Sequence, residues 1–219
     1  MIEEILPPCV AVEERRYDPA DATLFPDEEA VVARAVEKRR REFTTARMCA
    51  RAALQKLGFA TVSIPTGERG EPLWPTGALG SITHCDGYRA AAVARSREVV
   101  TLGIDAERNA PLPDGLVGDI ARPEELPSLR RLAADHPEVH WDRLLFSAKE
   151  SVYKAWFPLA RSWLGFEDAI VVFDPNACTF EVRLLVAGPQ LANGPLQALA
   201  GRWIARDGIV LTAISLTRT

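Results

Sequence analysis

Two short segments of the sequence carry charged side chains at spacings that suit chemistry. The first is Gly103–Glu107 (GIDAE), where two carboxylates follow an apolar run. Alternate side chains of an extended chain point the same way, so Asp105 and Glu107 can face one ion while Ala106 turns aside. Carboxylate oxygens are the ligands that Mg²⁺ prefers, with water and phosphate completing its shell. By itself this spacing is common, and a solvated strand end is the better explanation of it.

The second segment, Phe146–Lys154 (FSAKESVYK), has the spacing of an amphipathic helix. Glu150 and Lys154 lie one turn apart and therefore share a helix face. Apolar residues such as Ala148 form a stripe on roughly the opposite side. A surface ion pair worth about 0.3–0.5 kcal/mol is the common reason for such a Glu-Lys spacing. The second cation, Lys149, favours a functional site instead.

Together these segments resemble the signature of the surfactin-type phosphopantetheinyl transferases. Three upstream segments match the same family in order: KRRREFTTARMCAR at 38–51, GERGEPLWP at 67–75 and SITHCDGY at 81–88. The resemblance covers nearly the whole chain and looks like the branch that includes the enterobactin synthase component D and PptT. It implies an enzyme that moves the phosphopantetheine arm of coenzyme A onto a serine of a carrier protein and releases adenosine 3′,5′-bisphosphate.

The resemblance also implies roles for the charged residues of both segments. Asp105, Glu107 and Glu150 resemble three Mg²⁺ ligands, and Glu150 is also expected to be the general base that takes the proton of the carrier serine. Lys154 resembles the lysine that contacts the pyrophosphate and helps the leaving group. Lys149 is expected to add positive charge beside it. Glu150 and Lys154 are thus the predicted catalytic residues.

The nucleotide end of coenzyme A is expected to meet the N-terminal part of the chain. The resemblance implies contacts from two helix cations, a loop and a Thr-His pair that reaches the 3′-phosphate: Arg39, Arg47, Arg69, Gly70, Glu71, Pro72, Thr83 and His84. Arg69 stands where many relatives have Lys, and it offers a planar fork in place of a point charge. Ala106 lacks the oxygen that some relatives offer there, so water would complete the metal shell.

Hydrophobic spacing predicts two helical regions, each followed by strands. The first region is 26–57, as one helix or as two broken near 37–41, with a stop at Gly58; the second is 139–157, stopped by Pro158. Loops are predicted over 65–80 and 109–128. Strands are expected at 80–84, 89–95, 99–105, 169–173, 179–186, 199–206 and 209–216. Asp207-Gly208 predicts a hairpin between the last two.

This helix-then-strands order, found twice, predicts an α+β protein of two similar halves. The family fold implied by the resemblance agrees: a pseudo-dimer of two α+β halves with the ligand cleft between them. We expect an N-terminal half at 1–103, which contacts the nucleotide, and a C-terminal half at 104–219, which carries the metal site and the catalytic helix.

Composition limits the other classes of function. The 219 residues carry a net charge of −4, which argues against a general nucleic-acid binder. The acidic start MIEEILPP is unlike a signal peptide, and no apolar run approaches a membrane span. Four scattered cysteines suggest neither disulfides nor zinc. We therefore expect a cytoplasmic protein with reduced thiols that binds neither nucleic acid nor membrane and works as a monomer.

Two other classes of function stay open beside the transferase. One is a non-catalytic module that binds coenzyme A or a carrier protein, which would be expected to lose Asp105 or Glu150. The other is a different magnesium-dependent nucleotide enzyme, such as a phosphohydrolase, although no Walker A or G-x-G-x-x-G segment is present. Acyl, polyketide and peptidyl carrier proteins, with fatty-acid or siderophore pathways among them, all remain candidate partners.

Overall fold

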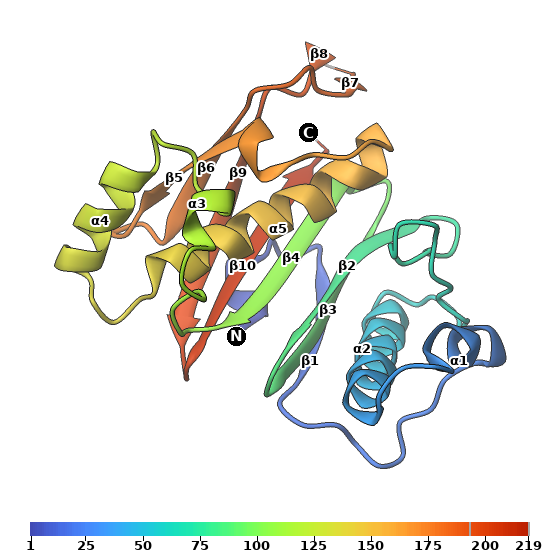
Figure 1. Ribbon diagram of the computed structural model, residues 1–219. Coiled ribbons are helices and arrows are strands. Elements are labelled where there is room, and N and C mark those ends of the chain that lie inside the picture. The colour runs from blue at the N-terminus through green and yellow to red at the C-terminus, as the bar shows by residue number, and fades with distance from the viewer. Residues whose placement is uncertain (193, 219) are drawn as a thin grey trace.

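The computed structural model describes residues 1–192 and 194–218, and its architecture is two antiparallel sheets that each carry one long helix (Figure 1). The N-terminal sheet has the strand order β1-β3-β2 and carries α2. Its elements, in chain order, are η1 (Ile2–Ile5), β1 (Ala11–Arg15), α1 (Pro26–Val32), α2 (Glu37–Lys56), β2 (Ala78–Cys85) and β3 (Tyr88–Arg95).

The C-terminal sheet has five strands in the order β4-β10-β9-β6-β5 and carries α5. A two-stranded ribbon, β7-β8, extends from it. The elements are β4 (Val99–Arg108), α3 (Val117–Ile120), α4 (Leu126–Asp135), α5 (Trp141–Ala160), η2 (Phe166–Asp168), β5 (Ala169–Asp174), β6 (Thr179–Leu184), β7 (Gln190–Leu191), β8 (Gly194–Pro195), β9 (Ala198–Arg206) and β10 (Ile209–Thr217). The α+β class predicted from the sequence is confirmed.

Small residues let α2 lie close to the N-terminal sheet. Ala50 and Ala53 of α2 are fully buried against Ala91 and Val93 of β3. The alternate residues of β3, such as Ala92, point to the other face of the sheet and into a second core. β3 is therefore buried on both faces, which explains its run of alanines.

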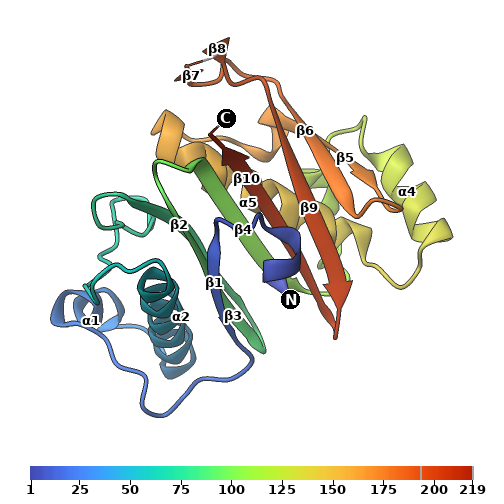
Figure 2. The ribbon, with the colours of Figure 1, turned by 180° about the vertical axis from the view of Figure 1, so that it is seen from behind.

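The second core joins the two sheets. Ala92 of β3 lies in it with Ile104 of β4 and Leu211 of β10, and η1 covers β9 and β10 on the face opposite α5 (Figure 2). At the seam between the sheets, where β2 lies beside β4, hydroxyl groups of β2 accept hydrogen bonds from backbone N–H groups of β4. The N–H of Ile104 donates to Ser81 Oγ at 3.0 Å, and the N–H of Ala106 donates to Thr83 Oγ1 at 2.9 Å.

Helix α5 packs onto β4 and β10 through an apolar stripe. Leu144, Leu145 and Ala148 are fully buried, and Val152 is nearly so. Gly103 of β4 allows the close approach, because a Cβ built there would lie 2.0 Å from the carbonyl oxygen of Ser151. The stripe fixes the rotation of α5 and leaves its other face at the seam between the sheets.

Most predicted elements are found, with four differences. Region 26–57 is two helices, and the break lies at residues 33–36, just before the predicted place. Residues 109–128 were predicted as loop, but α3 and the start of α4 lie within them. Pro158 does not stop α5, which continues to Ala160 and ends where Arg161 adopts a left-handed conformation. β6 ends at Leu184, two residues early.

The turns follow their residue types. Gly58 ends α2 with a φ of 76°, as its predicted stop requires, and Asp207 and Gly208 form the predicted hairpin with φ values of 54° and 74°. The predicted domain boundary after residue 103 falls inside β4, and the division into two related halves stays a prediction. Within residues 1–192 and 194–218, no helix is long and apolar enough to cross a bilayer.

Candidate active site

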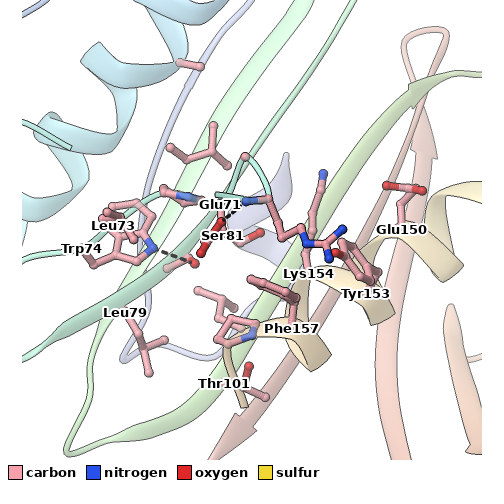
Figure 3. Close-up of a pocket in the computed structure, with 18 of the residues that line it drawn as sticks. Glu71, Leu73, Trp74, Leu79, Ser81, Thr101, Glu150, Tyr153, Lys154 and Phe157 are labelled. Atoms are coloured by element: carbon pink, nitrogen blue, oxygen red, sulfur yellow. Dashed lines mark hydrogen bonds between the residues drawn. The ribbon is translucent and has the colours of Figure 1, made fainter. Parts of the chain in front are cut away.

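A cavity of about 490 Å³ opens at the seam between the two sheets. Its walls come from α2, the loop before β2, β2 itself, β4 and α5. Figure 3 shows Tyr153, Lys154 and Phe157 of α5 on one side of this pocket and Leu73, Trp74 and Leu79 on the other. The pocket therefore joins segments that lie up to about half the chain apart.

Helix α5 gives the pocket one continuous face. Glu150, Tyr153, Lys154, Phe157 and Arg161 all line it, and their spacings of three and four residues keep them on one side of the helix. The buried stripe described above lies on the other side. The sequence prediction that Glu150 and Lys154 face away from the apolar stripe is confirmed.

The carboxylates of β4 meet α5 at two of its cations, Lys154 and Arg143. Lys154 donates from Nζ to Asp105 Oδ1 at 2.7 Å, and Thr83 Oγ1 donates to the same oxygen at 3.2 Å. Asp105 is only 5% exposed, and its Oδ2 is buried with no hydrogen-bond partner among the described residues. Glu107 accepts from Arg143 at 3.1 Å. As predicted, Ala106 turns aside, into the core between the sheets.

Burial, with the charge of Asp105, raises the pKa values of two glutamates. Burial raises the pKa of Glu107 to about 7, and the charge of Asp105 adds to this rise. The pKa of Glu150 is also raised, mainly by burial. The positive charge of Lys154 partly offsets this rise, and the negative charge of Asp105 adds to it. Like charges in one site disfavour ionisation until a cation joins them.

This donor set fits a hard cation such as Mg²⁺. It consists of carboxylate oxygens, one of which is buried without a hydrogen-bond partner among residues 1–192 and 194–218, and the charge of Asp105 acts on both Glu107 and Glu150. Throughout the described residues, however, no three acidic, thiol or imidazole groups lie close enough to hold a metal as they stand. Lys154 and Arg143 instead hold the oxygens of Asp105 and Glu107.

The opposite end of the pocket carries cations of α2. Arg47 is 4% exposed, and it donates from Nε to the carbonyl of Ile64 at 2.9 Å and from Nη2 to Thr66 Oγ1 at 2.9 Å. Its guanidinium also lies over the ring of Phe43. Burial lowers the pKa of Arg47 to about 10, so the group still carries its charge at neutral pH. Arg47 thus brings a buried cation to the pocket wall.

Arg39 and His84 meet at the pocket edge. The Arg39 guanidinium contacts His84 Nε2, and both residues line the pocket. Burial, followed by the charges of Arg39 and Lys154, lowers the pKa of His84 to about 4. The imidazole is therefore neutral at pH 7, and an anion bound between Arg39 and Lys154 would raise its pKa.

The predicted binding loop forms a small hairpin against the pocket. Thr66 and Pro72 form an isolated antiparallel bridge, and the N–H of Leu73 donates to the carbonyl of Pro65 at 2.8 Å. The four predicted residues at its tip all line the pocket: Arg69, Gly70, Glu71 and Pro72. Arg161 at the end of α5 reaches Glu71 at 3.4 Å, so the hairpin and α5 approach each other at the rim.

Two predicted ligand contacts are corrected by the structure. Thr83 is 2% exposed and binds Asp105 and Ala106 at the seam, so it positions β4 and does not line the pocket. Lys149 lies on the buried side of α5, because it is one residue out of phase with Glu150. Its ammonium donates to the carbonyls of Ile120 and Phe166 and to Glu125 Oε2 at 2.7 Å. Lys149 is a structural cation and adds no charge beside Lys154.

Sequence reasoning missed several pocket residues. Tyr153, Phe157 and Arg161 of α5 line the pocket, and so does Ser81 of β2. Tyr153, Phe157 and Arg161 follow Glu150 at helical spacing, and this signal could have found them. Ser81 stands two residues before Thr83 on the same strand face, but nothing local distinguishes it.

Comparison with known proteins identifies the family. The chain is 51% identical to the 4′-phosphopantetheinyl transferase Svp of Streptomyces mobaraensis over 219 residues, which cover 99% of this chain and 89% of Svp. The chain belongs to the 4′-phosphopantetheinyl transferase superfamily. Family models of the 4′-phosphopantetheinyl transferase N-terminal domain and of the superfamily match residues 27–94 and 101–203 of this transferase.

Further relatives of this transferase agree. It is 45% identical to PptT of Mycobacterium tuberculosis, over 99% of this chain and 98% of PptT. It is 33% identical to the enterobactin synthase component D of Salmonella typhimurium, over 81% of this chain and 72% of that protein. The chain is accordingly an enzyme, a phosphopantetheinyl transferase of the carrier-protein synthase type.

Proposed function

We propose that this transferase moves the phosphopantetheine arm of coenzyme A onto a serine of an apo carrier protein and releases adenosine 3′,5′-bisphosphate. One observation carries the proposal: Glu150 and Lys154 of α5 line the same pocket as Arg39, Arg47 and His84. An acid-base group, a cation for a leaving phosphate and a set of cations for a nucleotide thus share one cavity.

The nucleotide end of coenzyme A is proposed to lie at the α2 end of the pocket. Arg39 and Arg47 offer charged hydrogen-bond donors there for the 3′-phosphate and the pyrophosphate, and neutral His84, whose Nε2 accepts from Arg39, keeps Nδ1–H as its donor. The hairpin tip at residues 69–72 lies along the same wall and is proposed to contact the adenosine. The negative charge of a bound phosphate would attract both Arg39 and Lys154, whose positive charges both act on His84.

Mg²⁺ is proposed to bind Asp105, Glu107 and Glu150 and to supply positive charge that offsets the anionic pyrophosphate oxygens. Asp105 Oδ2, which has no hydrogen-bond partner in the part of the chain that the structure describes, and the raised pKa values of Glu107 and Glu150 support this assignment. Lys154 is proposed to exchange its bond to Asp105 for one to the leaving phosphate, where charge develops during transfer.

Glu150 is the proposed general base. The raised pKa of its half-buried carboxyl makes its carboxylate a better proton acceptor than an ordinary surface glutamate. It would take the proton of the carrier serine as the serine oxygen attacks the β-phosphorus of coenzyme A. The bond from that phosphorus to the bridging oxygen then breaks, and the nucleotide leaves with its phosphate near Lys154.

The test is conversion of an apo carrier protein to its holo form, followed by intact mass, with coenzyme A and Mg²⁺. We expect conversion by the native chain, loss of it on chelation of the metal, and loss in Glu150→Gln and Asp105→Ala without unfolding. Glu181→Gln, an exposed glutamate on β6, is the matched control and should convert carrier normally. Failure across a panel of acyl, polyketide and peptidyl carriers would overturn the proposal.

The finer assignments belong to the same proposal. We place the enzyme in the surfactin-type class, as a cytoplasmic monomer built as a pseudo-dimer. Relatives named enterobactin synthase component D favour a carrier of siderophore assembly among the panel. The relative rates on acyl, polyketide and peptidyl carriers would decide between these partners.

A further inference from the structure

A buried carboxylate outside the pocket holds the pocket loop in place. Glu28 of α1 is fully buried, and three donors make four hydrogen bonds to it. Arg51 of α2 donates to both of its oxygens, at 3.0 Å and 2.8 Å, the N–H of Phe25 donates to Oε2 at 2.9 Å, and the N–H of Ile64 donates to Oε1 at 2.8 Å. Arg51 uses one nitrogen, Nη1, for both oxygens, and its Nη2 donates to the carbonyl of Thr23, so charge and direction are both fixed.

Ile64 is the point where this network reaches the binding site. It is fully buried and directly precedes the hairpin that begins at Pro65 and returns at Leu73. Its N–H binds Glu28, and its carbonyl accepts from Arg47 Nε, so both sides of Ile64 are held by ionised groups. Residues 69–74 of the hairpin and its exit form a wall of the pocket.

Glu28 also acts on the pocket by its charge. Burial lowers the pKa of Arg47, and so do the positive charges of Arg51 and Arg39. The negative charge of Glu28 raises this pKa and so stabilises the charged form of Arg47. Arg47 thus lies between two other arginines, with Glu28 as the buried carboxylate whose charge acts on it. Removing that charge would leave Arg47 and Arg51 repelling each other in a poorly solvated place.

We propose that Glu28, together with Arg51, is a positioning residue for coenzyme A: it sets the place of Arg47 and of the hairpin at 65–73 through Ile64. This inference rests on the proposed function, because it assumes that the nucleotide end of coenzyme A lies against that wall. Glu28 does not touch the pocket itself, and its effect is on the KM for coenzyme A and not on the chemical step.

The test compares Glu28→Gln with the native enzyme. Glutamine keeps the shape and an acceptor oxygen but removes the charge and the second acceptor. We expect the KM for coenzyme A to rise about tenfold, since small displacements of binding groups cost about that much or more, with kcat and the carrier KM within about twofold. Calorimetric binding of adenosine 3′,5′-bisphosphate should weaken by the same factor.

The chain offers a closely matched control. Glu125 is also buried, pairs with one cation, Lys149, and accepts from two backbone N–H groups, those of Arg122 and Val171. Glu125→Gln should lower the thermal midpoint to a similar extent and leave the KM for coenzyme A unchanged. Should Glu28→Gln fail to fold, Arg51→Lys keeps the charge and loses the second nitrogen that donates to the carbonyl of Thr23, and its KM for coenzyme A should rise about threefold.

Each outcome decides the inference. A rise in coenzyme A KM confined to the Glu28 and Arg51 variants supports it. A fall in stability with unchanged KM, or an equal rise in Glu125→Gln, overturns it and makes Glu28 merely structural. If the native chain converts no carrier, the proposed function fails instead, and the binding of adenosine 3′,5′-bisphosphate to native and Glu28→Gln protein still tests the positioning role.

Discussion

Replacing Gly103 by alanine should damage catalysis through the packing of α5. A Cβ at this position would lie 2.0 Å from the carbonyl oxygen of Ser151 and 2.7 Å from the N of Ala155, whereas ordinary contact begins at 3.4 Å. Helix α5 would therefore have to move away by about 1.4 Å, the difference between 3.4 Å and 2.0 Å. The backbone atoms involved belong to Ser151 and Ala155, which directly follow Glu150 and Lys154, so both side chains move with them.

The expected magnitudes follow from that displacement. Overpacking of this kind costs about 1–3 kcal/mol of stability. For a chain of this size that lowers the thermal midpoint by roughly 2–10 °C. A displacement of about 1 Å of catalytic groups can lower the rate about 100-fold. Calorimetric melting and carrier conversion, followed by intact mass, measure the two effects separately.

Gly118 provides the control. A Cβ added there meets nothing within 4 Å, and its φ is not among the positive values, so Gly118→Ala should melt and react like the native enzyme. Native kcat and native stability in Gly103→Ala would refute the reasoning, since they would show that α5 does not need this close approach.

Two further predictions concern a titrating residue and a buried ion pair. Folding holds the pKa of His84 at about 4 against 6.5 for the free side chain, so the stability present above pH 6.5 is lost as pH falls toward 4. The loss should be about 2–3 kcal/mol at pH 4.5 by chemical denaturation, and matching pH profiles for native protein and His84→Gln would contradict it. Lys149→Met should cost about 3–5 kcal/mol because Glu125 stays buried and unpaired, and Lys149→Met with Glu125→Gln should recover part of that in urea. A stable Lys149→Met with a raised KM for coenzyme A would instead restore the pyrophosphate role predicted from the sequence.

Residue patterns within single helices, strands and turns predicted most of the fold. The spacing of apolar residues located α2 and α5, and the short apolar stretches predicted as strands were found as β2, β3 and β4 within a few residues. Gly58 and the pair Asp207-Gly208 marked a helix end and a hairpin because their backbone preferences are local. The helix α4 was missed because prolines around it resembled a loop, although a proline in the first turn of a helix is well tolerated.

The site was predicted less evenly. Periodicity placed Glu150 and Lys154 on one face, and the pocket contains both. It could not show which neighbouring cation faces the pocket, since Lys149 is only one residue away and points into the core. Nor could it show that Thr83 binds the backbone of β4, because that bond joins strands of two different sheets.

The sequence by itself determined which groups this transferase can use: carboxylates two apart on a strand, a glutamate and a lysine one turn apart on a helix, and arginines on another helix. These depend on spacing along one element, which the chain sets directly. Only the tertiary structure decided that Lys154 meets Asp105, that Arg39 meets His84 and that Glu28 holds Ile64. Those contacts join segments far apart in the chain, and they depend on how the sheets and helices pack and not on any local preference.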